Sequence, residues 1–292
     1  MQLVEYLAAN PPVVLIFAGL LGLLIGSFLN VVIHRVPVMM EREWRSQCAE
    51  MLDPEAKPEQ QQAYNLVVPR SRCPKCDHQI TALENVPVLS YLALKGRCSE
   101  CGWRIPLRYP IIELLTGLLS VLVVWRFGIS AAAGGALLLT WALIALSAID
   151  FDTQYLPDSI TLPFLWLGLA FNVAGIYTTT QASVLGAIVG YLALWSVYHL
   201  FRLVTGKEGM GYGDFKLLAL FGAWLGWSAV PLIVFLSAFV GAIVGIALIT
   251  LRGHDRNIPI PFGPYLAVAG WIALMWGEQL LDAYIGVSGL NL

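Results

Sequence analysis

Two acidic residues lie at the ends of apolar segments, where a charge is costly. Asp214 completes the set Gly211-Tyr212-Gly213-Asp214 at the start of one segment, and Asp150 ends an earlier one. An ionisable group at membrane depth is expensive, so such a residue is by default a candidate functional group. Two carboxylates brought together share a proton, and the ionised one can activate a water molecule. The pair predicts hydrolysis of a peptide bond inside or at the edge of a membrane.

Each acid has an alternative interpretation. Asp214 would also serve as a cap for the helix that follows it, as Asp commonly does. Asp152 and Asp158 are the other candidates for its partner. We favour Asp150 because it continues an apolar run, whereas Asp152 is expected past the helix end and Asp158 at the N-cap of the next helix. No Ser-His-Asp set and no His-Glu-x-x-His motif is apparent, which disfavours serine and zinc protease chemistry.

Four of the five cysteines form two closely spaced pairs. Cys73 and Cys76 enclose two residues, as do Cys98 and Cys101. Two C-x2-C pairs offer the four thiolates that tetrahedral structural zinc takes, and a redox pair or unrelated thiols are the alternatives. Because four cysteines leave no open position for water, we expect this zinc to stabilise the fold rather than to catalyse.

The composition is that of a membrane protein. Hydrophobic residues make up 58% of the 292 residues and charged residues only 12%, against about 25% in soluble domains. The apolar residues form blocks of roughly 17–25, the length of a spanning helix, without the alternation of a β-barrel. We therefore expect an all-α polytopic membrane protein with about eight transmembrane helices. The expected spans are 13–33, 111–127, 131–149, 159–178, 183–203, 215–227, 229–251 and 263–282.

Charge is concentrated in one segment after the first span. Eleven of the 17 Lys and Arg and nine of the 19 Asp and Glu lie between His34 and Arg108. This segment is expected to be cytoplasmic, because basic residues mark cytoplasmic loops. Both termini are then outside and both candidate acids face the cytoplasm. The near balance of charges makes no basic stripe, so we expect no nucleic-acid partner.

Proline and glycine interrupt the entry to the last span. Pro259, Pro261, Gly263 and Pro264 fall within six residues of one another. An opened helix start would expose backbone groups that could pair with an extended substrate strand, and a simple loop-to-helix turn is equally compatible. In the first span, Gly26 to Asn30 is expected to pack against another helix. Residues 49–65 are expected to form a linker, and no internal repeat is apparent.

In combination, these motifs resemble one family. The chain is similar over nearly its whole length to the bifunctional prepilin leader peptidase/N-methyltransferases, the type IV prepilin peptidases among the GxGD aspartyl proteases. The resemblance rests on Gly26-Ser27-Phe28-Leu29-Asn30-Val31-Val32-Ile33-His34-Arg35, the two C-x2-C pairs, Asp150 with Leu156-Pro157-Asp158, Gly211-Tyr212-Gly213-Asp214-Phe215-Lys216, and Pro261-Phe262-Gly263-Pro264.

The resemblance implies two activities in one chain of the bacterial inner membrane. Asp150 and Asp214 match the family's catalytic aspartates, which remove the basic leader of type IV prepilins and type II secretion pseudopilins on the cytoplasmic side. The new N-terminal residue is then methylated from S-adenosylmethionine, an activity that goes with the cysteine segment. For that cofactor the resemblance nominates only Gly96 and Arg97, and no dinucleotide-type fingerprint supports them.

The expected organisation has three parts. These are a tail with the first transmembrane helix (1–33), a cytoplasmic four-cysteine domain (34–110) and a membrane protease core (111–292). Three other classes compete with this interpretation. A transporter or proton channel would use the acids as relays, a membrane-anchored zinc-ribbon interaction module would need only the cysteines, and a presenilin-type protease would not need them.

Overall fold

The computed structural model describes residues 10–52, 63–252 and 261–288. Within these ranges the regular structure is helical, with only two isolated β-bridges. The expected outer tail, most of the expected linker and Pro259 lie outside the described residues. The helices are α2 (Pro11–Leu52), α3 (Leu89–Ala93), α4 (Arg108–Phe127), α5 (Ala131–Thr153), α6 (Asp158–Val173), α7 (Thr180–Thr205), α8 (Tyr212–Leu225), η1 (Trp227–Ala229), α9 (Val230–Arg252) and α10 (Gly263–Ser288).

The all-helical membrane architecture is confirmed. Each expected span coincides with a helix, and five of the described helices are long and apolar enough to cross a membrane: α2, α4, α5, α7 and the Trp227–Ala247 stretch. Helices α6 and α8 have only 16 and 14 residues. The chain is therefore a membrane protein, and the expected number of eight transmembrane helices is approximate.

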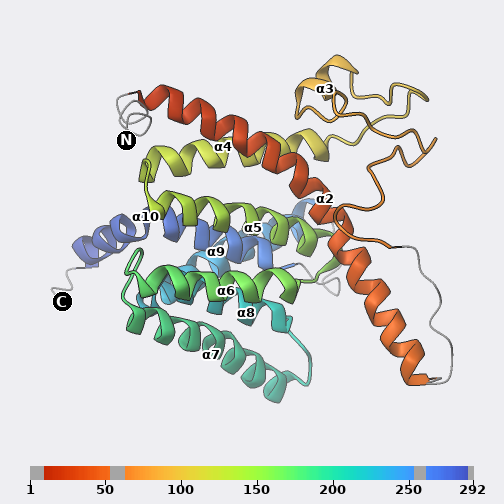
Figure 1. The fold of residues 1–292 in the computed structure, drawn as a ribbon. Helices are drawn as coiled ribbons and strands as arrows, with labels where there is room; N and C mark the ends of the chain where they lie inside the picture. Colours follow the sequence, from red (N-terminus) through yellow and green to blue (C-terminus); the bar gives the residue numbers. More distant parts are fainter. Residues whose placement is uncertain (1–9, 53–62, 253–260, 289–292) are drawn as a thin grey trace. The chain divides into compact units, whose positions relative to one another are not determined.

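Helix α2 is much longer than the expected first span. The span was expected to end at residue 33, but the helix continues through Pro37 to Leu52 (Figure 1). Hydropathy reports where a segment leaves the apolar phase, whereas the helix ends only where its hydrogen bonds end. The residues after 40 are exposed, as their charged composition requires.

The chain divides into two compact units, Met1–Trp125 and Arg126–Leu292. In the first unit, α2 and α4 pack through small residues. A Cβ on Gly22 would lie 2.8 Å from the Cα of Gly117, and one on Gly26 would lie 2.7 Å from the Cα of Glu113. Asn30 donates to the carbonyl of Tyr109 at 3.1 Å. The first-span motif is thus a helix-packing face closed by an interhelical hydrogen bond.

Helix α8 is the enclosed element of the second unit. Its residues from Asp214 to Trp224 are nearly all buried, and it contacts α6, α7, α9 and α10. Glycines allow α7 to approach closely: a Cβ on Gly186 would overlap the carbonyl oxygen of Gly222, and one on Gly190 would lie 2.6 Å from that of Leu218. Figure 1 shows α6 and α7 running beside this short helix. A helix enclosed by protein does not need the length of a lipid-exposed span.

Candidate active site and metal centre

Asp150 lies in the last turn of α5. The helix ends where Gln154 adopts a left-handed conformation, φ 55°, and its N–H donates to the carbonyl of Asp150. The Asp150 side chain is buried, and its Oδ2 accepts the backbone N–H of Gly263 at 3.0 Å. A charge-assisted bond of this kind orients the carboxyl group relative to the start of α10.

Asp214 lies at the start of α8 and makes the contacts of a helix cap. Its N–H donates to the carbonyl of Gly211 at 3.3 Å, and its carboxylate receives the backbone N–H of Gly211. This is one half of a capping box, because the N-cap residue Gly211 has no side chain to accept an N–H in return. Asp214 is also buried, and its charge interacts with that of Asp150. The capping contact and the juxtaposition with a second acid therefore coexist at one residue.

Leu156 is a residue at which three segments of this site meet. A Cβ on Gly213 would lie 2.8 Å from the Leu156 Cβ. A Cβ on Gly263 would lie 3.3 Å from the Leu156 Cδ1 and 2.6 Å from Oδ2 of Asp150. Both glycines are thus required for close approach, one beside each acid. Sequence reasoning assigned no role to Leu156, because nothing local to it shows which residues it contacts.

Pro261, Gly263 and Pro264 were expected either to open the start of the last helix to a substrate strand or to form a simple turn into that helix. Helix α10 begins at Gly263, with Pro264 in its first turn, where a missing N–H is tolerated. The N–H of Gly263 is not available to an extended substrate, because it donates to Asp150. The motif therefore positions an acid of the site.

The neighbouring acids have other surroundings. Asp152 is exposed, but it lies inside α5 and not past the helix end as expected, because the helix continues to Thr153 beyond the apolar run. The N-cap of α6 is Pro157 rather than Asp158, because Asp158 lies in the first turn and pairs with Lys216 at 2.6 Å. This ion pair joins the start of α6 to α8, two residues after Asp214.

We expect the Asp158–Lys216 pair to position the start of α8. Both side chains are partly exposed, so the pair contributes at most about 1 kcal/mol. Lys216→Ala should lower the cleavage rate by about fivefold with little change in KM. The reciprocal exchange Asp158→Lys with Lys216→Asp should restore most of that loss. If the exchange is as slow as Lys216→Ala alone, the pair has no positioning role.

The two cysteine pairs lie on two hairpins with the same hydrogen-bond pattern. In residues 71–80, Cys73 N–H donates to the carbonyl of His78 at 2.9 Å; in residues 96–105, Cys98 N–H donates to that of Trp103 at 2.8 Å. Each hairpin also has one antiparallel β-bridge between residues seven positions apart, which are Arg72 and Gln79 in the first and Arg97 and Arg104 in the second. The expectation of no internal repeat is therefore wrong: the repeat is only ten residues long and shares few identities outside Arg-Cys-x-x-Cys.

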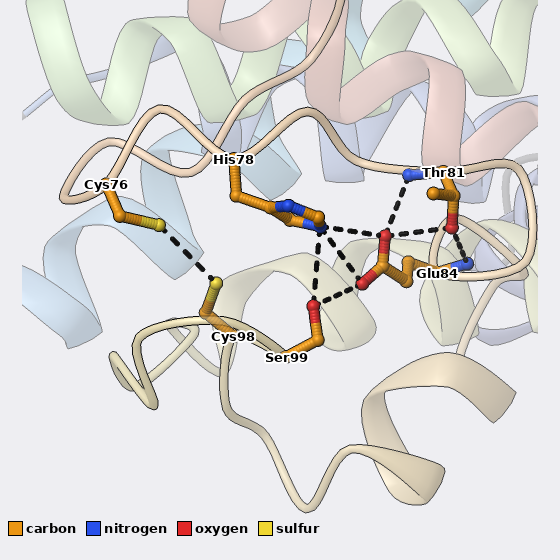
Figure 2. Close-up of polar contacts among 6 residues, drawn as sticks. All are labelled: Cys76, His78, Thr81, Glu84, Cys98 and Ser99. Atoms are coloured by element: carbon orange, nitrogen blue, oxygen red, sulfur yellow. Dashed lines mark hydrogen bonds and ion pairs between the residues drawn. The ribbon is translucent and has the colours of Figure 1, made fainter.

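The four thiols form a site that fits one zinc ion. Their Sγ atoms all lie within 4.8 Å of one another, and those of Cys73 and Cys101 are 3.8 Å apart. The sulfurs of Cys76 and Cys98, which Figure 2 shows, are 3.9 Å apart. Zn–S bonds of about 2.3 Å place tetrahedral sulfurs about 3.8 Å apart. The backbone N–H groups of Lys75 and Cys76 lower the pKa of the Cys73 thiol to about 7, whereas burial and the neighbouring thiols, against the backbone N–H of His78, raise that of Cys76 to about 12.

The residues nominated for the methyl donor have different environments. Gly96 is buried in a turn with φ +66°, and its N–H donates to the carbonyl of Tyr91. A Cβ on Gly96 would lie 2.7 Å from the Tyr91 hydroxyl, so this glycine is required by packing. Arg97 is exposed.

Comparison with known proteins assigns the chain to a family. Residues 20–127 match the bacterial peptidase A24 N-terminal domain, and residues 137–246 match the type IV leader peptidase family. The chain belongs to the type IV leader peptidase family. It is 57% identical to the prepilin leader peptidase/N-methyltransferase of Stutzerimonas stutzeri (98% of this chain, 99% of the relative) and 55% identical to that of Pseudomonas aeruginosa (100% of each).

A more distant member of this family also aligns with this chain over nearly its full length. The prepilin leader peptidase/N-methyltransferase of Neisseria gonorrhoeae is 49% identical over 95% of this chain and 96% of its own length. No solved structure gives a significant match. The resemblance drawn from the motifs is therefore confirmed over the full chain.

Proposed function

We propose that Asp150 and Asp214 are the catalytic pair with which this chain cleaves the leader of prepilins and pseudopilins. The observation that carries the proposal is the burial of both carboxylates where α5, α8 and α10 meet, with Gly263 against Asp150 and Leu156, and Gly213, next to Asp214, against the same Leu156. The family and the names of its relatives support the same activity.

The chemistry follows from one proton shared between two acids. The ionised carboxylate removes a proton from water, and the oxygen attacks the scissile carbonyl carbon. The neutral carboxyl hydrogen-bonds to the carbonyl oxygen and polarises it, and its proton passes to the departing amine when the tetrahedral intermediate collapses, while the other acid keeps the proton taken from water. The peptide C–N bond breaks, which releases a leader with a new carboxylate and a pilin with a free N-terminal amine. One water is consumed, and the pair returns to its singly protonated state.

We place this reaction at the cytoplasmic side of the bacterial inner membrane. The basic residues of 34–108 mark that side, and the same topology puts the ends of α5 and α8 there. A prepilin has a basic leader followed by an apolar helix, so its scissile bond lies where water meets the bilayer. The protease core is then 111–292, after the tail and first helix (1–33) and the cysteine domain (34–110).

We assign methylation of the new N-terminus to the cysteine domain. Cys73, Cys76, Cys98 and Cys101 would hold zinc as a structural ion, with no open position for chemistry. S-adenosylmethionine would supply the methyl group to the amine that cleavage releases. Of the two nominated residues, Arg97 has the exposed guanidinium that can pair with a carboxylate such as that of the methyl donor, while Gly96 shapes the turn.

The test is a reaction of the purified chain in detergent with a prepilin, with and without S-adenosylmethionine. Mass spectrometry is expected to show removal of the leader in both reactions. The mature N-terminus should gain one methyl group only when the cofactor is present. A folded chain that leaves prepilin intact, but conducts protons or solute in vesicles, would favour the transporter instead.

A further inference from the structure

The loop between the two hairpins carries a carboxylate that contacts both of them. Glu84 receives the hydroxyl hydrogen of Ser99, which is next to Cys98 on the second hairpin. It also lies 3.2 Å from Nε2 of His78, on the first hairpin. Figure 2 shows the three side chains converging beside the sulfurs of Cys76 and Cys98. Glu84 therefore joins the two hairpins beside the thiols and reinforces the direct contact of 3.4 Å between Ser99 and His78.

The position of Glu84 is fixed by its own turn. The N–H and the hydroxyl of Thr81 both donate to Oε2 of Glu84 at 2.8 Å, and the N–H of Glu84 donates to the Thr81 hydroxyl at 3.3 Å. This Thr-x-x-Glu arrangement is the reciprocal one of a capping box. These contacts, Ser99 first, lower the pKa of Glu84 to about 2, so the side chain is an ionised acceptor at neutral pH.

A short path of contacts connects Glu84 to the metal ligands. The His78 ring faces Glu84, and the backbone N–H of His78 donates to the Cys76 thiol. On the other side, Ser99 follows Cys98 directly in the chain. The two sulfurs at the ends of these paths, Cys76 and Cys98, lie 3.9 Å apart. Fixing Glu84 therefore fixes one edge of the thiol tetrahedron.

The same three side chains are not a hydrolytic triad. In such a triad, serine and acid bind opposite ring nitrogens, so that the acid orients the ring that removes the serine proton. Here the Ser99 hydroxyl and both oxygens of Glu84 lie at the same nitrogen, Nε2 of His78. The Ser99 hydroxyl also donates its hydrogen directly to Glu84 and not to the ring of His78, so the ring does not activate Ser99 as a nucleophile. The geometry serves to hold the hairpins together.

We propose that Glu84 is the positioning residue that latches the two cysteine hairpins, and that it sets how firmly the domain retains zinc. The proposal rests on the proposed zinc. Residues that orient metal ligands without binding the metal typically change affinity by about 10–100-fold when lost. Because Glu84 acts through His78 and Ser99, its removal should loosen the site without removing a ligand.

The experiment measures zinc release from the full-length protein in detergent. Zinc transfer to a chromogenic chelator is followed for the wild type, Glu84→Gln and the matched control Glu100→Gln, an exposed acid two residues after Cys98. Glu84→Gln is expected to speed release by about 10–100-fold, and Glu100→Gln to leave it unchanged. Equal rates for wild type and Glu84→Gln, or equal acceleration by both variants, would overturn the latch.

Two further measurements keep the outcome decisive. If Glu84→Gln is not recovered folded, Ser99→Ala removes one hydrogen bond of Glu84 and should still accelerate zinc release several-fold; an unchanged rate overturns the proposal.

If the wild type binds no zinc, the metal assignment fails separately. The latch is then tested in a Cys73→Ser/Cys101→Ser background, where of the four clustered thiols only Cys76 and Cys98 remain for phenylarsine oxide to bridge: bridging should be slower in Glu84→Gln, and equal rates would overturn the latch.

Discussion

Asp150→Asn and Asp214→Asn are each expected to lower the rate of leader cleavage by about 10⁴-fold. In the proposed mechanism, either change removes one of the two carboxylates that share a proton, so the pair can no longer both accept a proton from water and donate one to the leaving amine. The amide keeps the size of the carboxylate, and in Asp150→Asn the amide oxygen can still accept the Gly263 N–H. The measurement is single-turnover cleavage of a prepilin, followed by mass spectrometry.

The matched control for these variants is Asp152→Asn. Asp152 lies two residues from Asp150 but is exposed. We expect this variant to cleave at close to the wild-type rate. The opposite result, a silent Asp150→Asn with an inactive Asp152→Asn, would move the partner role to Asp152.

Gly263→Ala is expected to lower cleavage by about 10²-fold or more without unfolding the protein. The new Cβ would lie 2.6 Å from Oδ2 of Asp150, a separation that forces the carboxylate to move and breaks its hydrogen bond with the Gly263 N–H. A misplacement of about 1 Å at a reacting group has effects of this size. Because the change acts on the geometry of the reacting group, the loss should lie mainly in kcat rather than in KM.

The control is Gly134→Ala, on the same helix as Asp150. A Cβ there meets no atom within 4 Å, so alanine should be neutral or slightly stabilising, with normal cleavage. Thermal unfolding of both variants is followed in parallel. A Gly263→Ala protein that cleaves at the wild-type rate would show that the contact does not position Asp150.

The general architecture was predictable because it depends on averages along the chain. Transfer of roughly 20 apolar residues into lipid dominates the free energy of a span, so hydropathy located the helices of both units. It did not predict that α2 continues to Leu52, since no hydropathy signal marks where hydrogen bonding ends. The metal site was equally predictable, because the spacing of its four cysteines is a local pattern in the sequence.

The contacts that position the candidate sites were not predictable in the same way. The Gly263 donor lies 113 residues from Asp150, and Leu156 contacts glycines that belong to two different helices. A single sequence does not encode such pairings in any local pattern. The sequence analysis assigned no role to Thr81 or Glu84, and only the fold shows that Glu84 binds Thr81 in its own turn and Ser99 on the other hairpin.

The most direct test of the account uses the double variant Asp150→Asn/Asp214→Asn with two substrates. One is intact prepilin, and the other is the same pilin already freed of its leader. Both are incubated with S-adenosylmethionine, and the products are weighed by mass spectrometry. We predict no cleavage of the prepilin and wild-type methylation of the mature pilin, because only the aspartate pair is disabled. Cleavage by the double variant, or loss of methylation in a folded protein, would contradict the assignment of the two reactions to separate sites.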